Sequence, residues 1–162
     1  MSESGPANFT GEWIDNMHTR FKKTTSCFTE DDASFTPKPE LYTVAAHIAH
    51  VADSIEWFIE PAFEGKPFNM DFEAMAAKAI GVKSLAAAFE WLDRAFESLK
   101  KHAGAVTPDQ MDKALYATDS PIMPGATLPQ ILSVIEDHTA HHRGSLAVYA
   151  RLLGKVPPMP YM

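Results

Sequence analysis

The chain has 162 residues, of which 46% are hydrophobic and 22% charged, a composition typical of one folded globular domain. Its net charge of −7 excludes the positive surface needed to bind nucleic acid or an anionic membrane, so we expect neither partner. The single cysteine, Cys27, excludes an internal disulfide and indicates a reducing, cytoplasmic compartment. The polar, acidic start is unlike a targeting peptide, and no apolar run approaches the roughly 20 residues of a membrane span. We expect one domain over 1–162, with extended tails at 1–7 and 155–162.

The first half of the chain contains two segments with the apolar periodicity of amphipathic helices. In the first segment, at about 8–25, every fourth residue is apolar: Phe9, Trp13, Met17 and Phe21. An acidic loop with two prolines, 29–39, separates it from a second helix at about 39–59. Pro39 suits the first turn of this second helix, and we expect Pro61 and Gly65 to end it.

The second half contains two further long helices. The connection 64–81 mixes turn residues with Met and Phe, which predicts an irregular or short helical segment. The third long helix covers about 82–103, and 107–110 has the capping pattern of a short helix start. The fourth covers about 127–153 and stops at Gly154. Since no segment alternates with period two for long, the predicted fold is all-α, an antiparallel four-helix bundle.

The last helix carries the stretch 137–144, which packs three of the seven histidines into five residues. His138 and His142 are one turn apart on the same face, so their imidazoles can bind one metal ion. The glutamate that follows the first histidine in zinc-protease helices is replaced by Thr139, which argues against a protease. His141 lies 100° round the helix from His142, and we expect it to point outward or to contact a ligand histidine without binding the ion.

A third ligand must come from another helix, and the second helix offers His47 and His50. A buried helical histidine is by default a hydrogen-bonded core residue, but bundles build metal sites from side chains of facing helices. Spacing alone leaves both histidines open. Three neutral imidazoles leave a fourth coordination position free, as in a catalytic zinc site, and they also suit nickel. A di-iron site fits poorly, because Glu-x-x-His pairs are missing from these helices.

The two histidine-bearing helices resemble those of the DinB-like superfamily. The run 138–144 (His-Thr-Ala-His-His-Arg-Gly), followed by Arg-Leu-Leu-Gly at 151–154, resembles the family's final helix. In the second helix Tyr42 precedes His50 by eight positions, where the family has an aromatic residue, often Trp, before a metal-binding histidine. His47 competes with His50 for this assignment. The resemblance implies three metal ligands: His50, His138 and His142.

The resemblance also implies an up-down-down-up bundle, often a homodimer, with a divalent ion such as zinc or nickel near one end. Characterised relatives include transferases and isomerases that use a low-molecular-weight thiol, bacillithiol or mycothiol. We therefore expect a metal-dependent thiol S-transferase, or a related isomerase or hydrolase, acting on a small-molecule substrate. Nearby candidates for proton transfer are Asp53, Ser54, Arg143 and Tyr149.

Two alternatives stay open from the sequence. One is a non-catalytic metal-binding or stress-response bundle, in which the ion only joins two helices. The other is a bundle without metal, which would have to satisfy several inward imidazoles by hydrogen bonds alone, an expensive arrangement of polar groups.

Overall fold

Residues 6–162, which the computed structural model describes, form five α-helices and two short 3₁₀ turns. The elements in chain order are α1 (Pro6–Thr25), η1 (Glu30–Asp32), α2 (Val44–Phe63), α3 (Phe72–Gly81), α4 (Leu85–Gly104), η2 (Pro108–Gln110) and α5 (Leu128–Leu152). Within this part of the chain there is no strand, only an isolated bridge between Ala114 and Thr127. The predicted all-α class is therefore confirmed.

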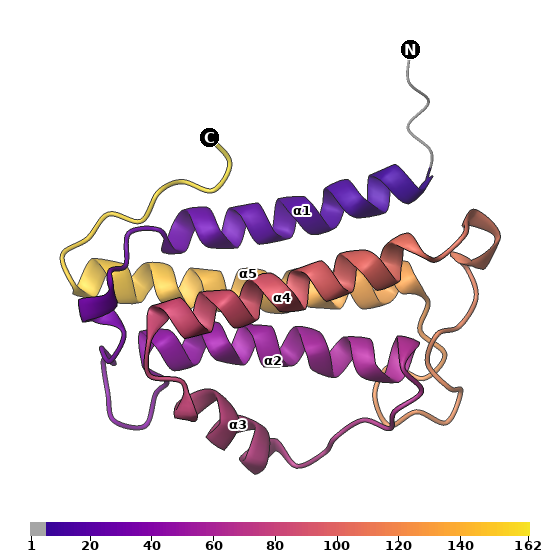
Figure 1. The fold of residues 1–162 in the computed structure, drawn as a ribbon, viewed down its shortest axis with the longest axis horizontal. Coiled ribbons are helices and arrows are strands. Elements are labelled where there is room, and N and C mark those ends of the chain that lie inside the picture. The colour runs from indigo at the N-terminus through magenta and orange to yellow at the C-terminus, as the bar shows by residue number, and fades with distance from the viewer. Residues whose placement is uncertain (1–5) are drawn as a thin grey trace.

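The four long helices lie side by side along the long axis of the molecule, and the shorter α3 lies outside them (Figure 1). α1 contacts both α4 and α5, and α2 contacts the same two helices, so the four form a closed ring around one core. α3 packs against α2. Within residues 6–162, every helix is too short or too polar to span a lipid bilayer.

Each long helix turns an apolar stripe toward the centre of this ring. The largest fully buried side chains come from all four helices and include Phe21, Ile48, Ile55, Leu92, Phe96, Leu132 and Ile135. Burial of each such side chain contributes roughly 1.5–3 kcal/mol. The stripes also fix how far each helix is rotated about its axis. That rotation determines which polar side chains of α2 and α5 face each other.

The stripe predicted for α1 is buried only in its C-terminal half. Met17 and Phe21 are buried, but Phe9 is 65% exposed and only rests against Trp13, with 6.2 Å between ring centroids. Ile14, outside the predicted row, is buried instead. A row of residues spaced by four drifts about 40° per step round a helix of 3.6 residues per turn. Over three steps this carries Phe9 out of the core.

α2 begins and ends later than the sequence predicts. Its N-cap is Thr43, whose side chain accepts a hydrogen bond from the Ala46 amide at 3.2 Å, and Pro39 lies in the loop before it. Pro61 lies inside the last turn, where its missing N–H removes one helical hydrogen bond, and the helix continues only to Phe63. Gly65, with φ at +65°, follows the C-cap residue Glu64.

The other boundaries lie within a few residues of the predicted ones. Ser84 caps α4, and Thr127 caps α5 together with Gln130. Gly154, with φ at +73°, follows the end of α5. The capping pattern at 107–110 produces only the 3₁₀ turn η2, because the chain then turns back to pair near Thr127.

The C-terminal segment 155–162 contains no helix and runs back past α1 (Figure 1). At its start the Lys155 ammonium pairs with the Asp32 carboxylate. Near its end the Tyr161 ring lies under two guanidinium groups, 5.3 Å from Arg20 and 5.7 Å from Arg143. Of the tail predicted for 1–7, residues 1–5 lie outside the described residues, and the next two belong to α1.

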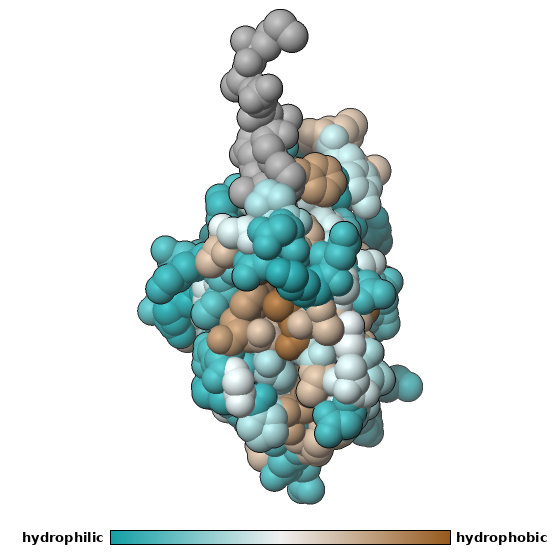
Figure 2. Space-filling view, turned by 90° about the vertical axis from the view of Figure 1, so that its right-hand side faces the viewer, coloured by the Kyte–Doolittle hydropathy of each residue, from teal (hydrophilic) through white to brown (hydrophobic). Residues whose placement is uncertain are grey.

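The end of the bundle formed by the C-terminal turn of α2 and the loops near 66–68 and 115–121 has an open cavity of about 570 Å³. Figure 2 views this end and shows apolar side chains gathered within a polar frame. The cavity is lined by Pro61 at the last turn of α2, whereas His50 lies in the second turn. At 1.5 Å per residue these two positions are roughly 16 Å apart along the helix axis. The cavity is thus distant from the histidines.

Candidate metal centre

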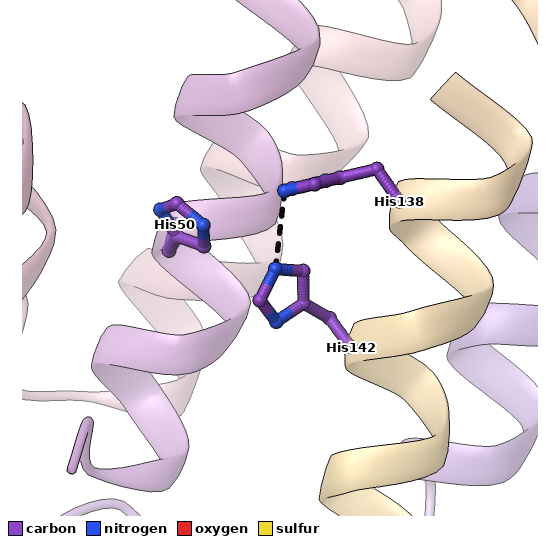
Figure 3. A group of neighbouring side chains, drawn as sticks. All are labelled: His50, His138 and His142. Carbon is purple, nitrogen blue, oxygen red and sulfur yellow. Dashed lines mark hydrogen bonds between the residues drawn. The ribbon is translucent and has the colours of Figure 1, made fainter. Parts of the chain in front are cut away.

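The histidines of α2 and α5 meet where the first two turns of α2 face the middle of α5. His138 and His142 project from α5 toward α2, and His50 lies on the facing helix (Figure 3). One ring nitrogen from each of these three residues falls within 4.8 Å of the other two. The His138 and His142 Nε2 atoms are 3.1 Å apart. The three histidines assigned from the sequence are thus brought together, while their binding of an ion stays a prediction.

The donor set suits a divalent ion such as zinc. Two nitrogens at tetrahedral positions about 2.05 Å from one ion are roughly 3.3 Å apart, close to the separation of the two Nε2 atoms. His50 supplies the third imidazole, and its ring centroid lies 5.4 Å from that of His138 and 4.8 Å from that of His142. In the described part of the chain, no carboxylate, thiol or fourth imidazole joins this group. The set is therefore three nitrogen ligands from two helices.

The site keeps its imidazoles neutral, which is the form that binds metal. Burial, reinforced by repulsion among the neighbouring histidines, lowers the pKa of His47 and His138 to about 4 and that of His142 to about 2. Burial also lowers the pKa of His50, although the nearby Asp53 carboxylate opposes this effect. At neutral pH, protons therefore compete little with an ion for these nitrogens.

His47, the competing candidate on α2, has a different place. Its side chain is 6% exposed, and its Nε2 lies 2.6 Å from Nδ1 of His142. His142 contacts His138 through its Nε2 and His47 through its Nδ1. His47 and His138 therefore contact different nitrogens of the His142 ring. Its own Nδ1 is buried with no hydrogen-bond partner. Of the two histidines left open by the sequence, only His50 joins the group of three.

Two of the proton-transfer candidates are buried in α2. Asp53 lies one turn after His50, and one carboxylate oxygen accepts a hydrogen bond from Lys78 at 2.6 Å. Its other oxygen is buried without a partner. Burial raises the pKa of Tyr42, and the Asp53 charge adds to this shift. Ser54 is also buried.

The candidates on α5 are held by other contacts. The Tyr149 hydroxyl donates to the Tyr42 carbonyl at 3.2 Å. The Arg143 guanidinium donates to the Tyr161 hydroxyl at 3.2 Å and so faces the C-terminal segment. Asp137 and His141 are exposed, and His141 touches the His142 ring edge-on at 4.9 Å between centroids. His141 thus points outward, as predicted.

Sequence reasoning missed Lys78, which couples α3 to this part of α2. Its ammonium bonds Asp53, lies 3.7 Å from Glu56 and sits 4.4 Å above the Trp91 ring centroid. Nothing local distinguishes this lysine from the other surface lysines of the chain. The contact exists only because α3 folds back onto α2, so a single sequence offers no signal for it.

Comparisons with known proteins agree with this architecture. The sequence model of the DinB family matches residues 8–162. The fold resembles the crystal structure of a conserved protein from Enterococcus faecalis, with a TM-score of 0.64 and 21% identity over 96% of this chain and 99% of that one. At this identity the likeness shows the fold alone. A comparison with curated proteins finds no match. Because the family match covers nearly the whole sequence, the chain belongs to the DinB family.

Proposed function

We propose that this chain is a cytoplasmic, divalent-metal-dependent enzyme that acts on a small-molecule substrate. Zinc or nickel would be held by His50, His138 and His142. The observation that carries the proposal is the convergence of three neutral imidazoles, from two helices, within 4.8 Å. When bound, such an ion supplies a Lewis acid that can lower the pKa of a thiol or of water.

A catalytic role is favoured over a purely structural one by the composition and exposure of the site. Structural zinc sites are closed by four protein ligands, whereas catalytic sites keep one position for water or substrate. Only three ligand residues converge within the described residues. All three are half-buried, so solvent and small molecules can approach them.

The reaction class that we propose is transfer or isomerisation with a low-molecular-weight thiol as cosubstrate. In a transfer, the thiol sulfur forms a bond to an electrophilic carbon, the leaving group departs with its electron pair, and the thiol proton passes to a base. The chain's own contribution is to bind and orient the thiol near three neutral imidazoles. Tyr42 contributes an aromatic wall beside them, 5.2 Å from His50 between ring centroids.

The test of the metal site is elemental analysis of the purified protein and of three variants, His50→Ala, His138→Ala and His142→Ala. We expect about one ion per wild-type chain and loss of the ion from each variant, because two imidazoles hold a divalent ion poorly. His102→Ala is the matched control, since His102 is a half-buried histidine near the end of α4 and outside the group. Equal metal content in all five proteins would reject the site.

The test of the activity is a thiol-conjugation assay with and without a chelator. We expect turnover to fall on chelation and to return when zinc or nickel is added back. Turnover that is indifferent to chelation would rule out metal-dependent catalysis.

The alternative is a metal that only joins α2 to α5, which the origin of the ligands from two helices supports. This role predicts metal binding and stabilisation without turnover of any thiol. The elemental analysis and the thiol-conjugation assay together distinguish this structural role from the enzymatic one.

We further propose a homodimer and an up-down-down-up order of α1, α2, α4 and α5. The connection 64–84, which contains α3, is long enough for α2 and α4 to run in the same direction, and the course of the ribbon in Figure 1 supports this order. Exposed apolar side chains on α5 and the segment after it, Val148, Leu152 and Val156, support self-association. Light scattering after size-exclusion chromatography tests the dimer, and a mass of one chain would reject it.

A further inference from the structure

The imidazoles of His47, His142 and His138 form a continuous chain of contacts across α2 and α5. Nε2 of His47 lies 2.6 Å from Nδ1 of His142, and Nε2 of His142 lies 3.1 Å from Nε2 of His138. Both ring nitrogens of His142 are therefore engaged. Nε2 faces His138, and Nδ1 faces His47.

The chemistry of a neutral imidazole assigns a direction to the first contact. Such a ring carries one N–H, on either Nδ1 or Nε2. If the Nε2 lone pair of His142 binds an ion, its single proton must be on Nδ1. That N–H then needs an acceptor, and Nε2 of His47 lies at hydrogen-bond distance from it.

The surroundings of His47 leave this contact as its one polar interaction. The ring is buried, and its walls include the rings of Tyr42, 6.1 Å away, and Tyr149, 5.5 Å away, between centroids. Its Nδ1 is buried and unpartnered. An apolar side chain would avoid this unsatisfied nitrogen, so a histidine here costs stability that a core position does not require. A buried polar atom without a partner is expected where the residue has a functional role.

We propose that His47 is a positioning residue, which accepts the Nδ1–H of His142 and so holds the tautomer and orientation that direct the His142 Nε2 toward the metal. The inference rests on the proposed metal site. His47 itself is not one of the three proposed ligands, because its Nε2 contacts Nδ1 of His142, the nitrogen that is not paired with His138. Its role matches that of the carboxylates and carbonyls that accept the second N–H of metal-binding histidines in other proteins.

The first test measures zinc affinity by competition with a chromophoric chelator, starting from metal-free protein. His47→Leu removes the acceptor and fills the space with apolar atoms, while His47→Gln replaces it with an amide oxygen that can accept a hydrogen bond. We expect His47→Leu to weaken zinc binding about 10- to 100-fold, with one ion per chain retained. His47→Gln should lose less affinity than His47→Leu.

His141→Leu is the matched control. His141 also contacts the His142 ring, but at the surface and without a hydrogen bond between the two rings. The zinc affinity of His141→Leu should stay within about twofold of the wild type, well below the loss expected for His47→Leu. Circular dichroism of each metal-free protein reports whether the variant is folded.

The second test begins with wild-type protein, and its first readout requires no variant. In wild-type protein loaded with cobalt(II), the ring N–H of each ligand histidine gives a paramagnetically shifted, exchangeable proton signal. The signal of His142 should be protected from exchange, because His47 and the buried surroundings hold that proton. In His47→Leu it should exchange faster. A residue that only packs against its neighbours would not change this signal.

The outcomes separate the inference from the proposed site. Wild-type zinc affinity in His47→Leu, or an unprotected His142 proton in the cobalt protein, overturns the positioning role while the metal site stands. Loss of the ion from both His47 variants, as from His142→Ala, makes His47 a ligand and also overturns it. If wild-type protein binds no metal at all, the proposed function fails, and this inference falls with it.

Discussion

At the scale of single residues, the histidine cluster disfavours protonation. Burial and mutual repulsion hold the pKa of His47 and His138 at about 4, below the ordinary value of 6.5. Between these two pH values the unfolded chain binds protons that the folded chain does not. The free energy of unfolding of the metal-free protein must therefore fall as the pH drops from about 6.5 toward 4.

This effect predicts a pH-dependent loss of stability that a single substitution reduces. A separation of one pKa unit corresponds to about 1.4 kcal/mol. In urea unfolding of metal-free protein at pH 7.5 and pH 5, we expect His138→Gln to lose about 1–2 kcal/mol less than the wild type does, because glutamine does not titrate. The same loss of stability in both proteins would show that the His138 ring is not shielded as described.

The residue scale is also where sequence reasoning reached its limit. Four-residue spacing sufficed to place His138 and His142 on one face, and their Nε2 atoms do face each other. His47 and His50 are three residues apart, which is about 60° round a helix, so both point toward α5. Which of the two joins His138 and His142 depends on the rotation of α2 about its own axis, and core packing sets that rotation. Neither spacing nor composition contains that rotation.

At the scale of elements, helix ends fixed by their own residues were predictable and those fixed by tertiary contacts were not. Thr127 and Gln130 cap α5 locally, and that boundary was predicted within a residue or two. The start of α2 depends on η1 and the loop after it. The Val44 amide donates to the Phe35 carbonyl at 2.9 Å, and the Ala45 amide to the Ala33 carbonyl at 3.0 Å. These bonds satisfy amides of the first helical turn, so no helical residues before Thr43 are needed to accept hydrogen bonds from them. The helix can therefore begin at Val44.

The attachment of α3 gives a prediction at this scale. Lys78 is more than half exposed, but its partner Asp53 is buried, so removing the ammonium leaves a buried carboxylate without its cation. Lys78→Met keeps much of the aliphatic stem. We expect it to lower the free energy of unfolding by about 1–3 kcal/mol, less than a fully buried pair because the lysine is solvated.

Hydrogen exchange distinguishes this local effect from a general one. In Lys78→Met the backbone amides of α3 should exchange faster, while those of α4 and α5 change little. Lys83→Met is the control, since the Lys83 ammonium bonds only the Ile80 carbonyl at the surface. If both variants behave alike, the ion pair with Asp53 does not hold α3 in place.

At the scale of the whole molecule, the proposed ion joins two helices that are far apart in the chain. In the sequence, α2 and α5 are separated by α3, α4 and the connection 105–127. The two helices meet in space only after the bundle has closed. Helical periodicity was enough to predict the bundle, since each apolar stripe needs partners. Periodicity could not predict which helices contact each other, because these contacts depend on the loops that connect the helices as well as on their apolar faces.

A ligand that binds the folded chain and not the unfolded one stabilises the fold by mass action. The three imidazoles are within 4.8 Å of one another only when α2 faces α5, so the unfolded chain lacks the complete site. At a free zinc concentration 100 times the dissociation constant, the gain is about 2.7 kcal/mol. For a chain of this length this gain corresponds to a rise in Tm of about 5–10 °C.

Differential scanning calorimetry with and without zinc measures this shift. His142→Ala should show no rise in Tm, because the remaining imidazoles cannot hold the ion. His47→Leu should approach the wild-type rise only at higher zinc concentrations, since its site is intact but weaker. A wild-type Tm that does not respond to zinc, in protein shown by elemental analysis to bind it, would mean that the unfolded chain binds the ion equally well. The metal would then contribute nothing to holding α2 against α5.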